Sequence, residues 1–158
     1  KVKFLYVGRM SPEKGIYHFL KMFDQLEFDA ELSIVGDSDN QKISNKNIKL
    51  LGYIADEQTL INIYDTHNIM ILPSFTEATP YVVDESLSRK RPVIIFEDIA
   101  YITKDRKGIF ISKRDINSFS ENVKYIISNY LEIQKSIEQN IPPTKKNMLK
   151  QISDIINS

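Results

Sequence analysis

The chain has 158 residues, which suits one domain and is short for two. Lysine plus arginine and aspartate plus glutamate both count 21, and the resulting net charge of zero argues against a dominant nucleic-acid or anionic-membrane surface. The absence of cysteine excludes disulfides, thiol catalysis and Cys-ligated zinc, and the two distant histidines, His18 and His67, argue against a His-rich metal site.

No apolar run reaches the roughly 20 residues that a membrane helix needs, and no signal peptide opens the sequence. The first residues, Lys1–Val7, already have the pattern of a buried strand. Because a natural chain rarely begins so abruptly, we expect that material is missing before Lys1.

Short apolar runs alternate with segments of helical periodicity along the chain. The expected strands are, in chain order, Phe4–Val7, Glu31–Val35, Ile48–Leu51, Asn68–Leu72, Pro92–Phe96 and Gly108–Ile111. Near-continuous apolar strands separated by helices are typical of a parallel sheet covered on both faces. The pattern therefore predicts a Rossmann-like, doubly wound α/β domain of about six strands flanked by helices.

The first helix is expected after the first strand, because apolar residues recur there at spacings of three and four. These residues are Ile16, Phe19, Leu20, Phe23 and Leu26. Asp56 has the position and side chain of an N-cap for a second helix. Asp115 is expected to cap, in the same way, a helix that runs to about Leu131.

Thr79 and Pro80 predict the start of the helix after the fourth strand, as its N-cap and its first helical residue. This helix is expected to run through Ser88. Its inward-facing positions are Val82, Val83, Ser86 and Leu87.

Residues 141–158 are expected to form a C-terminal helix within the same single domain, 1–158. Pro142 and Pro143 end the preceding helix, and Thr144 caps the new one. Its apolar stripe must be buried. Two alternatives stay open for the surface that buries it: this domain's own sheet and a missing partner domain. The stripe consists of Met148, Leu149, Ile152, Ile155 and Ile156.

The loop after the first strand, Gly8–Gly15, carries Arg9 and Lys14 beside a helix N-terminus. Ligands of doubly wound sheets bind at this carboxyl end of the strands. The loop matches neither GxGxxG nor a P-loop, but two fixed cations with free backbone N–H groups suit a diphosphate. The alternative is that both are solvated surface charges, as most lysines and arginines are.

Two glutamates follow the fourth strand, with Glu77 before the helix and Glu85 inside it. The helix N-terminus supplies N–H donors at Tyr81 and Val82 and a partial positive charge. A carboxylate beside such an anion site suits sugar hydroxyls, and a second one deeper on the helix suits ribose hydroxyls. Taken singly, each glutamate is better explained as a surface charge.

Together these motifs, GRxxxEKG after the first strand and E-x7-E after the fourth, resemble family 4 of the retaining glycosyltransferases, in the C-terminal domain of their GT-B fold. The resemblance covers nearly the whole chain and implies that the N-terminal acceptor domain is absent from it. Shorter pieces agree with it, namely Val35-Gly36-Asp37, Ile48–Gly52 with Tyr53, Asp65 before Asn68-Ile69, and Leu72-Pro73-Ser74.

The resemblance implies a role for each residue of the site. Arg9 and Lys14 would hold the diphosphate of the donor, Glu77 the hydroxyls of the transferred sugar, and Glu85 the ribose; Arg9, Lys14 and Glu77 form the catalytic set. The other donor-binding residues are Gly8, Asp37, Tyr53, Ile54, Thr79, Pro80, Tyr81 and Val82, with Tyr53 and Ile54 lining the base. The sugar would be transferred with retention of configuration and without a metal ion or other cofactor.

The sequence departs from the family pattern in two places. Thr79-Pro80-Tyr81 stands where relatives often carry glycines, and the bulky Tyr81 is expected to narrow the sugar pocket. Glu97-Asp98 stands where relatives often have Gly-Gly, so we expect a stiffer or differently shaped loop after the fifth strand.

The partners implied are a nucleotide-sugar donor, the missing N-terminal domain, and a glycan or lipid acceptor, with no nucleic acid. The expected setting is cytoplasmic polysaccharide biosynthesis, at the inner face of the membrane if the missing half binds a lipid. Two alternatives stay open: a non-catalytic scaffold module, and a sugar phosphorylase or nucleotide-sugar epimerase with the same architecture.

Overall fold

The structure, a computed structural model, describes residues 1–37 and 43–142. It contains one sheet of six strands in the order β3-β2-β1-β4-β5-β6, and all neighbouring strands are parallel. This is the doubly wound order, which confirms the predicted Rossmann-like α/β fold. The strands are β1 (Val2–Val7), β2 (Ala30–Val35), β3 (Ile48–Gly52), β4 (Ile69–Leu72), β5 (Val93–Phe96) and β6 (Ile109–Ser112).

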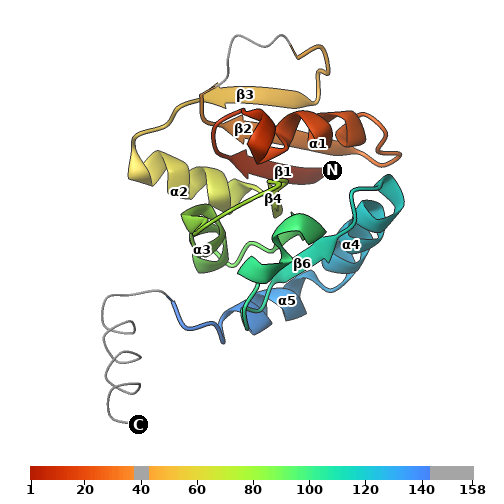
Figure 1. The fold of residues 1–158 in the computed structure, drawn as a ribbon. Helices are drawn as coiled ribbons and strands as arrows, with labels where there is room; N and C mark the ends of the chain where they lie inside the picture. The colour runs from red at the N-terminus through yellow and green to blue at the C-terminus, as the bar shows by residue number, and fades with distance from the viewer. Residues whose placement is uncertain (38–42, 143–158) are drawn as a thin grey trace.

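Helices flank the sheet (Figure 1). Phe119 packs on Phe4 of β1 and on Phe19, with ring centroids 5.7 and 5.3 Å apart, so the helices that carry Phe19 and Phe119 share one face. Val7 of β1 points to the other face, where two further helices lie against it. The helices are α1 (Ile16–Phe23), α2 (Glu57–Thr66), α3 (Tyr81–Ser88), α4 (Ile116–Ser128) and α5 (Tyr130–Ile137), with 3-10 turns η1 (Pro12–Lys14) and η2 (Glu97–Ile102).

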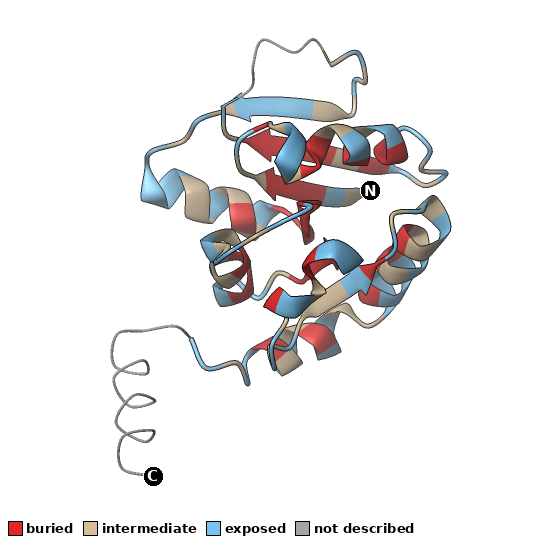
Figure 2. Cartoon of the chain, viewed as in Figure 1, coloured by how far each residue is buried: buried red, intermediate tan, exposed pale blue. Residues whose placement is uncertain are grey.

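The core lies along the middle strands of the sheet. Every residue of β4 and β5 is buried, as the apolar runs predicted. β3, at the edge, is different: Lys49, Leu50 and Leu51 are all exposed (Figure 2). An edge strand has a neighbouring strand on one side only. The apolar residues of β3 therefore predicted a strand correctly, but they did not predict that its side chains are exposed.

The two aspartate caps are confirmed. The carboxylate of Asp56 accepts from the amide of Thr59 at 2.8 Å, and that of Asp115 accepts from the amide of Ser118 at 2.8 Å. Each bond satisfies an amide that has no partner inside its helix.

The predicted end of the fourth long helix was wrong. α4 ends at Ser128, short of Leu131, because Asn129 leaves helical geometry (φ −117°, ψ 22°) and its side-chain amide donates to the carbonyl of Tyr125 at 2.8 Å. The chain then turns into α5, and the hydroxyl of Tyr130 donates to the carbonyl of Asn68 at 2.7 Å. A side chain that binds its own helix backbone competes with the next helical turn.

The predicted start of α3 was wrong by one residue. Pro80 is extended (φ −78°, ψ 93°) and no side chain caps the helix, so Tyr81 begins it and Thr79 is not an N-cap. The ψ of Pro80 is far from the helical value, so Pro80 takes the N-cap position instead of the first helical position and the helix starts one residue later. Val82, expected to face inward, is only partly buried, and Leu26 lies beyond the end of α1 at Phe23.

Ile141 and Pro142 follow α5 without regular secondary structure. The rest of the helix expected over 141–158 lies outside the described residues.

A glycine lets the loops at the carboxyl ends of β1 and β4 touch. Gly15 has a φ of 65°, and a Cβ placed on it would lie 2.0 Å from the carbonyl oxygen of Pro73. No other residue type combines this left-handed conformation with so close an approach of two backbones.

Replacing Gly15 with alanine is expected to lower the free energy of unfolding by about 2–5 kcal/mol, because left-handed strain and a backbone clash add together. Gly52→Ala is the matched control, since Gly52 has a φ of 71° but nothing lies within 4 Å of an added Cβ. Strain alone should cost about 1–2 kcal/mol there. Urea unfolding measures the loss of unfolding free energy in both variants. Equal losses would contradict the proposed close contact of Gly15 with the carbonyl of Pro73.

His67 is buried at the end of α2. Its Nδ1 lies 2.6 Å from the carbonyl oxygen of Ile63, and its Nε2 lies 2.9 Å from the hydroxyl of Ser33. A carbonyl only accepts, so Nδ1 donates and Nε2 accepts from Ser33. Burial lowers the pKa of His67, because the charged ring would lose its hydration, while the bond to Ile63 opposes this shift.

The unfolded chain takes up a proton at the ordinary histidine pKa of 6.5, whereas folded His67 resists it. The free energy of unfolding should therefore fall as the pH drops below that value, by at most about 1.4 kcal/mol per pH unit. Urea unfolding at about pH 7.5 and about pH 5.5 measures the slope. His67→Gln should reduce it, and His18→Gln, at an exposed histidine, should leave it unchanged.

Candidate functional site

The order of the strands reverses between β1 and β4, which pair in parallel at the middle of the sheet. The loops after them lead to helices on opposite faces, which opens a crevice at the carboxyl edge. The backbone amide of Phe75 donates to the carbonyl of Glu13 at 3.0 Å and ties the two loops together.

A first pocket of about 230 Å³ lies in this crevice. It is formed by the ends of β1 and β4, by η1 and by the start of α3. The predicted site residues that line it are Gly8, Lys14, Glu77, Thr79, Pro80, Tyr81 and Val82. Residues that are far apart in the sequence thus share one small cavity.

Lys14 and Glu77 are in direct contact in this pocket. Nζ of Lys14 donates to Oε1 of Glu77 at 2.8 Å, and the hydroxyl of Ser74 donates to the same oxygen at 2.6 Å. The side chains of Lys14 and Glu77 are 27% and 7% exposed. Within the described residues, Oε2 of Glu77 accepts no hydrogen bond, so one oxygen of a nearly buried carboxylate remains available to a ligand.

The N-terminus of α3 forms another wall of the pocket. The amide of Val83 donates to the carbonyl of Pro80, whereas the amides of Tyr81 and Val82 find no acceptor in the described part of the chain. Unpaired amides at a helix N-terminus attract anions, and the helix dipole strengthens the attraction.

A second pocket, of about 410 Å³, adjoins the first, since Gly8 and Val82 line both. The predicted residues around it are Gly8, Arg9, Asp37, Tyr53, Ile54, Val82 and Glu85. The structure therefore places every predicted site residue on these two pockets, while the role of each one stays a prediction.

Glu85 is oriented by a tyrosine that the sequence analysis did not single out for the site. The hydroxyl of Tyr64, which is buried on α2, donates to Oε2 of Glu85 at 2.8 Å. Burial raises the pKa of Tyr64, and the nearby carboxylate of Glu85 raises it further, so the hydroxyl stays protonated and donates. One carboxylate oxygen of Glu85 is thereby fixed on the protein.

The loop that carries Arg9 is held by Tyr6, whose hydroxyl donates to the carbonyl of Arg9 at 2.7 Å. Burial raises the pKa of Tyr6, and the carboxylates of Glu77 and Glu13 add to the shift. The side chain of Arg9 is exposed and makes no ion pair with any described residue, so its charge is available to a ligand.

Three more residues missed by sequence reasoning hold the Glu77 loop: Ser74, Tyr101 and Arg114. Ser74 is the last residue of the Leu72-Pro73-Ser74 motif, where it was noted for the resemblance but given no role in the site. Tyr101 and Arg114 lie after β5 and β6, and no spacing or motif links them to Glu77.

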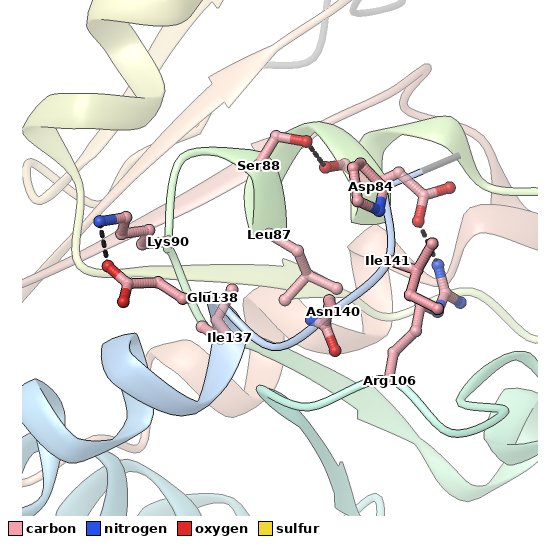
Figure 3. A pocket seen from close by; sticks show the side chains of 10 residues that line it. Asp84, Leu87, Ser88, Lys90, Arg106, Ile137, Glu138, Asn140 and Ile141 are labelled. Atoms are coloured by element: carbon pink, nitrogen blue, oxygen red, sulfur yellow. Dashed lines mark hydrogen bonds and ion pairs between the residues drawn. The ribbon is translucent and has the colours of Figure 1, made fainter. Parts of the chain in front are cut away.

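A separate pocket of about 290 Å³ lies between α3 and the end of α5 (Figure 3). No predicted site residue lines it. Its charged side chains are already paired, Asp84 with Arg106 and Lys90 with Glu138. It offers no unpaired cation to an anionic ligand, so we place the candidate site in the crevice.

Within residues 1–37 and 43–142, no three acidic or histidine side chains are grouped closely enough to hold a metal ion. No helix in the same part of the chain has the length and apolar character needed to cross a membrane.

Solved structures resemble the whole chain. Sucrose-phosphate synthase from Thermosynechococcus elongatus has a TM-score of 0.75 and 18% identity, and the match covers 99% of this chain and 45% of that one. HepE from Anabaena, in complex with UDP and glucose, has a TM-score of 0.73 and 15% identity, with coverage of 100% and 48%. At these identities the likeness shows the fold alone.

Sequence comparison identifies the family. A Bacillus subtilis (strain 168) protein named as a provisional teichuronic acid biosynthesis glycosyltransferase, TuaC, is 30% identical over 91 residues, which are 57% of this chain and 23% of that protein. The chain thus spans less than half the length of each of these relatives. The family model described as glycosyl transferases group 1 matches residues 1–129, and the chain belongs to this family.

Proposed function

We propose that this chain is the donor-binding half of a retaining glycosyltransferase and that it takes a nucleotide-diphosphate sugar. The observation that carries the proposal is the contact of Lys14 with Glu77 beside the N-terminus of α3. Around this one pocket lie a cation, a carboxylate with one oxygen that accepts no hydrogen bond from the described residues, and the amides of a helix N-terminus. The cation and the amides suit a phosphate, and the carboxylate suits sugar hydroxyls.

The diphosphate would lie where the two pockets meet. Lys14 lines one pocket, Arg9 the other, and Val82 of α3, whose amide is unpaired in the described part of the chain, lines both. As the bond to the sugar breaks, negative charge grows on the leaving diphosphate, and these groups stabilise it without reorganising. The two cations take the place that a metal ion would fill, so we propose no metal for this site.

The sugar would occupy the first pocket, with its hydroxyls donating to Oε2 of Glu77. Thr79 and Pro80 line the same cavity, and Tyr81, whose side chain is 72% exposed, stands at its rim. We assign Glu77 to binding rather than to nucleophilic attack, as the resemblance to family 4 implies.

The nucleoside would occupy the second pocket. Glu85, held by Tyr64, has one oxygen left to accept from ribose hydroxyls. Tyr53 and Ile54 would contact the base, and Asp37 lies on the same cavity wall.

The relatives support the chemistry. HepE was solved in complex with UDP and glucose, and TuaC is named for teichuronic acid biosynthesis. We infer a role in cytoplasmic polysaccharide synthesis, with a glycan or lipid acceptor bound by a domain beyond this chain, at the inner face of the membrane for a lipid. Transfer needs both substrates held in one geometry, so this chain alone should bind the nucleotide weakly and transfer sugar poorly or not at all.

Lys14→Ala should weaken binding of the preferred nucleoside diphosphate by about 10–100-fold, because a charge-assisted bond to phosphate is lost. Glu77→Ala should leave the diphosphate within about twofold and weaken only its sugar conjugate, by roughly tenfold. Isothermal calorimetry with UDP, GDP, ADP and their glucose conjugates measures both effects and identifies the base.

Lys124→Ala and Glu121→Ala, at exposed positions of α4, are the matched controls and should bind as the unchanged chain does. If the folded chain binds none of these nucleotides, the scaffold alternative replaces the proposal.

Glu85→Ala should weaken the preferred nucleoside diphosphate by roughly tenfold, because ribose hydroxyls lose their acceptor. The 2′,3′-dideoxy nucleotide lacks those hydroxyls, so its affinity should not change. Calorimetry measures the affinity of both nucleotides for the unchanged chain and for Glu85→Ala, and the four values form a double-mutant cycle. An equal loss for the two nucleotides would remove Glu85 from the ribose site.

A further inference from the structure

Glu77 lies in the segment between β4 and α3, which has no regular secondary structure. No helix or strand ladder fixes its backbone, although its carboxylate must be placed accurately if it is to accept from a ligand. Its position therefore depends on contacts from other parts of the chain. Besides the contacts with η1 described above, two come from η2, after β5, and from the segment after β6.

The hydroxyl of Tyr101, in η2, makes two hydrogen bonds with the backbone of Glu77. It accepts from the Glu77 amide at 3.0 Å and donates to the Glu77 carbonyl at 2.6 Å. One hydroxyl thus satisfies both main-chain polar groups of this residue. Tyr101 is 59% exposed, so these hydrogen bonds, rather than packing of the ring, are its main contribution.

Arg114 holds the start of the same segment. Its Nη2 donates to the carbonyls of Pro73 and Ser74 at 2.9 and 3.0 Å, and its guanidinium lies 3.9 Å from the ring centroid of Phe75. Asp98 fixes Arg114 in turn, with Oδ2 accepting from Nε at 2.7 Å. Ser74, placed in this way, donates to the Glu77 carboxylate.

Asp98 and Tyr101 both lie in the loop where the sequence departs from the Gly-Gly of relatives. That departure predicted a stiffer or differently shaped loop, and the structure has a 3-10 turn there, η2. A glycine at position 98 would not supply the carboxylate that fixes Arg114. Asp98 and, three residues later, Tyr101 together give this chain its own means of holding the segment that carries Glu77.

We infer that Tyr101 is a positioning residue that, with Arg114 at the start of the segment, aims Glu77 at the transferred sugar. The inference rests on the proposed function and deepens it, because it assigns sugar recognition to a contact outside both pockets. It separates the two parts of the donor: the sugar depends on Tyr101, and the diphosphate, held by Arg9, Lys14 and α3, does not.

The first test is calorimetry on Tyr101→Phe, which removes one hydroxyl from a largely exposed ring. With the nucleotide that the unchanged chain binds best, the affinity for the diphosphate should stay within about twofold, and that for its glucose conjugate should fall roughly 3–10-fold. Tyr125→Phe is the matched control, because Tyr125 on α4 is 57% exposed and its hydroxyl makes no hydrogen bond with a described residue. It should match the unchanged chain.

The second test needs no ligand. Tyr101→Phe should speed hydrogen exchange of the Glu77 amide at least several-fold, since this amide loses its acceptor, while amides in β1 and β4 keep their rates. An unchanged Glu77 rate overturns the inference, and so does general loss of protection, because Tyr101 would then be a structural residue only.

The outcomes separate this inference from the function beneath it. If the unchanged chain binds no nucleotide, the proposed function fails, and the inference fails with it. If it binds nucleotides and Tyr101→Phe keeps the affinity ratio of conjugate to diphosphate, only the inference is overturned. An equal loss for both ligands overturns it as well.

Discussion

The contact between Lys14 and Glu77 depends on the approach of two backbones at Gly15. The residues are 63 positions apart, and their charged atoms lie 2.8 Å from each other. The reversal of strand order puts their loops at one edge of the sheet, and the left-handed Gly15, against the carbonyl of Pro73, removes the space that a side chain would need. The contact therefore depends on a position that has no side chain, and Lys14 directly precedes that position in the chain.

Desolvation explains why Glu77 needs so many partners. A carboxylate that is only 7% exposed loses most of its hydration, a cost that must be offset by charge or hydrogen bonds. Lys14 and Ser74 offset it at one oxygen, and Tyr101 satisfies the backbone behind it. The second oxygen keeps its acceptor capacity, so the same contacts that make burial tolerable leave one atom ready for a ligand.

Sequence reasoning succeeded where the cause is local or repeated. Apolar runs predicted every strand, and Asp56 and Asp115 predicted their helix starts, because strand burial and capping depend on neighbours in the chain. It also brought Lys14 and Glu77 to one edge, because parallel strands end together. It failed at Tyr101, whose partner Glu77 is 24 residues away, because such a contact follows no periodicity and only the folded chain reveals it. It also failed at Asn129, although the bond to the carbonyl of Tyr125 is local, because an asparagine can continue a helix or end it and the apolar pattern continues past it.

The order of the groups along the cleft gives a further reason to favour a nucleotide-diphosphate sugar, apart from any likeness to relatives. Glu77 lines the first pocket and Glu85 the second, each pocket has one cation, and Val82, whose amide is unpaired in the described part of the chain, lines both. Each glutamate has one oxygen held by the protein and one left to accept. Acceptors at both ends with an anion site between them fit a ligand with hydroxyls at both ends and negative charge in the middle. A free sugar lacks the charge and a simple nucleotide lacks the second set of hydroxyls, whereas a sugar joined through a diphosphate to a ribonucleoside has all three parts in this order.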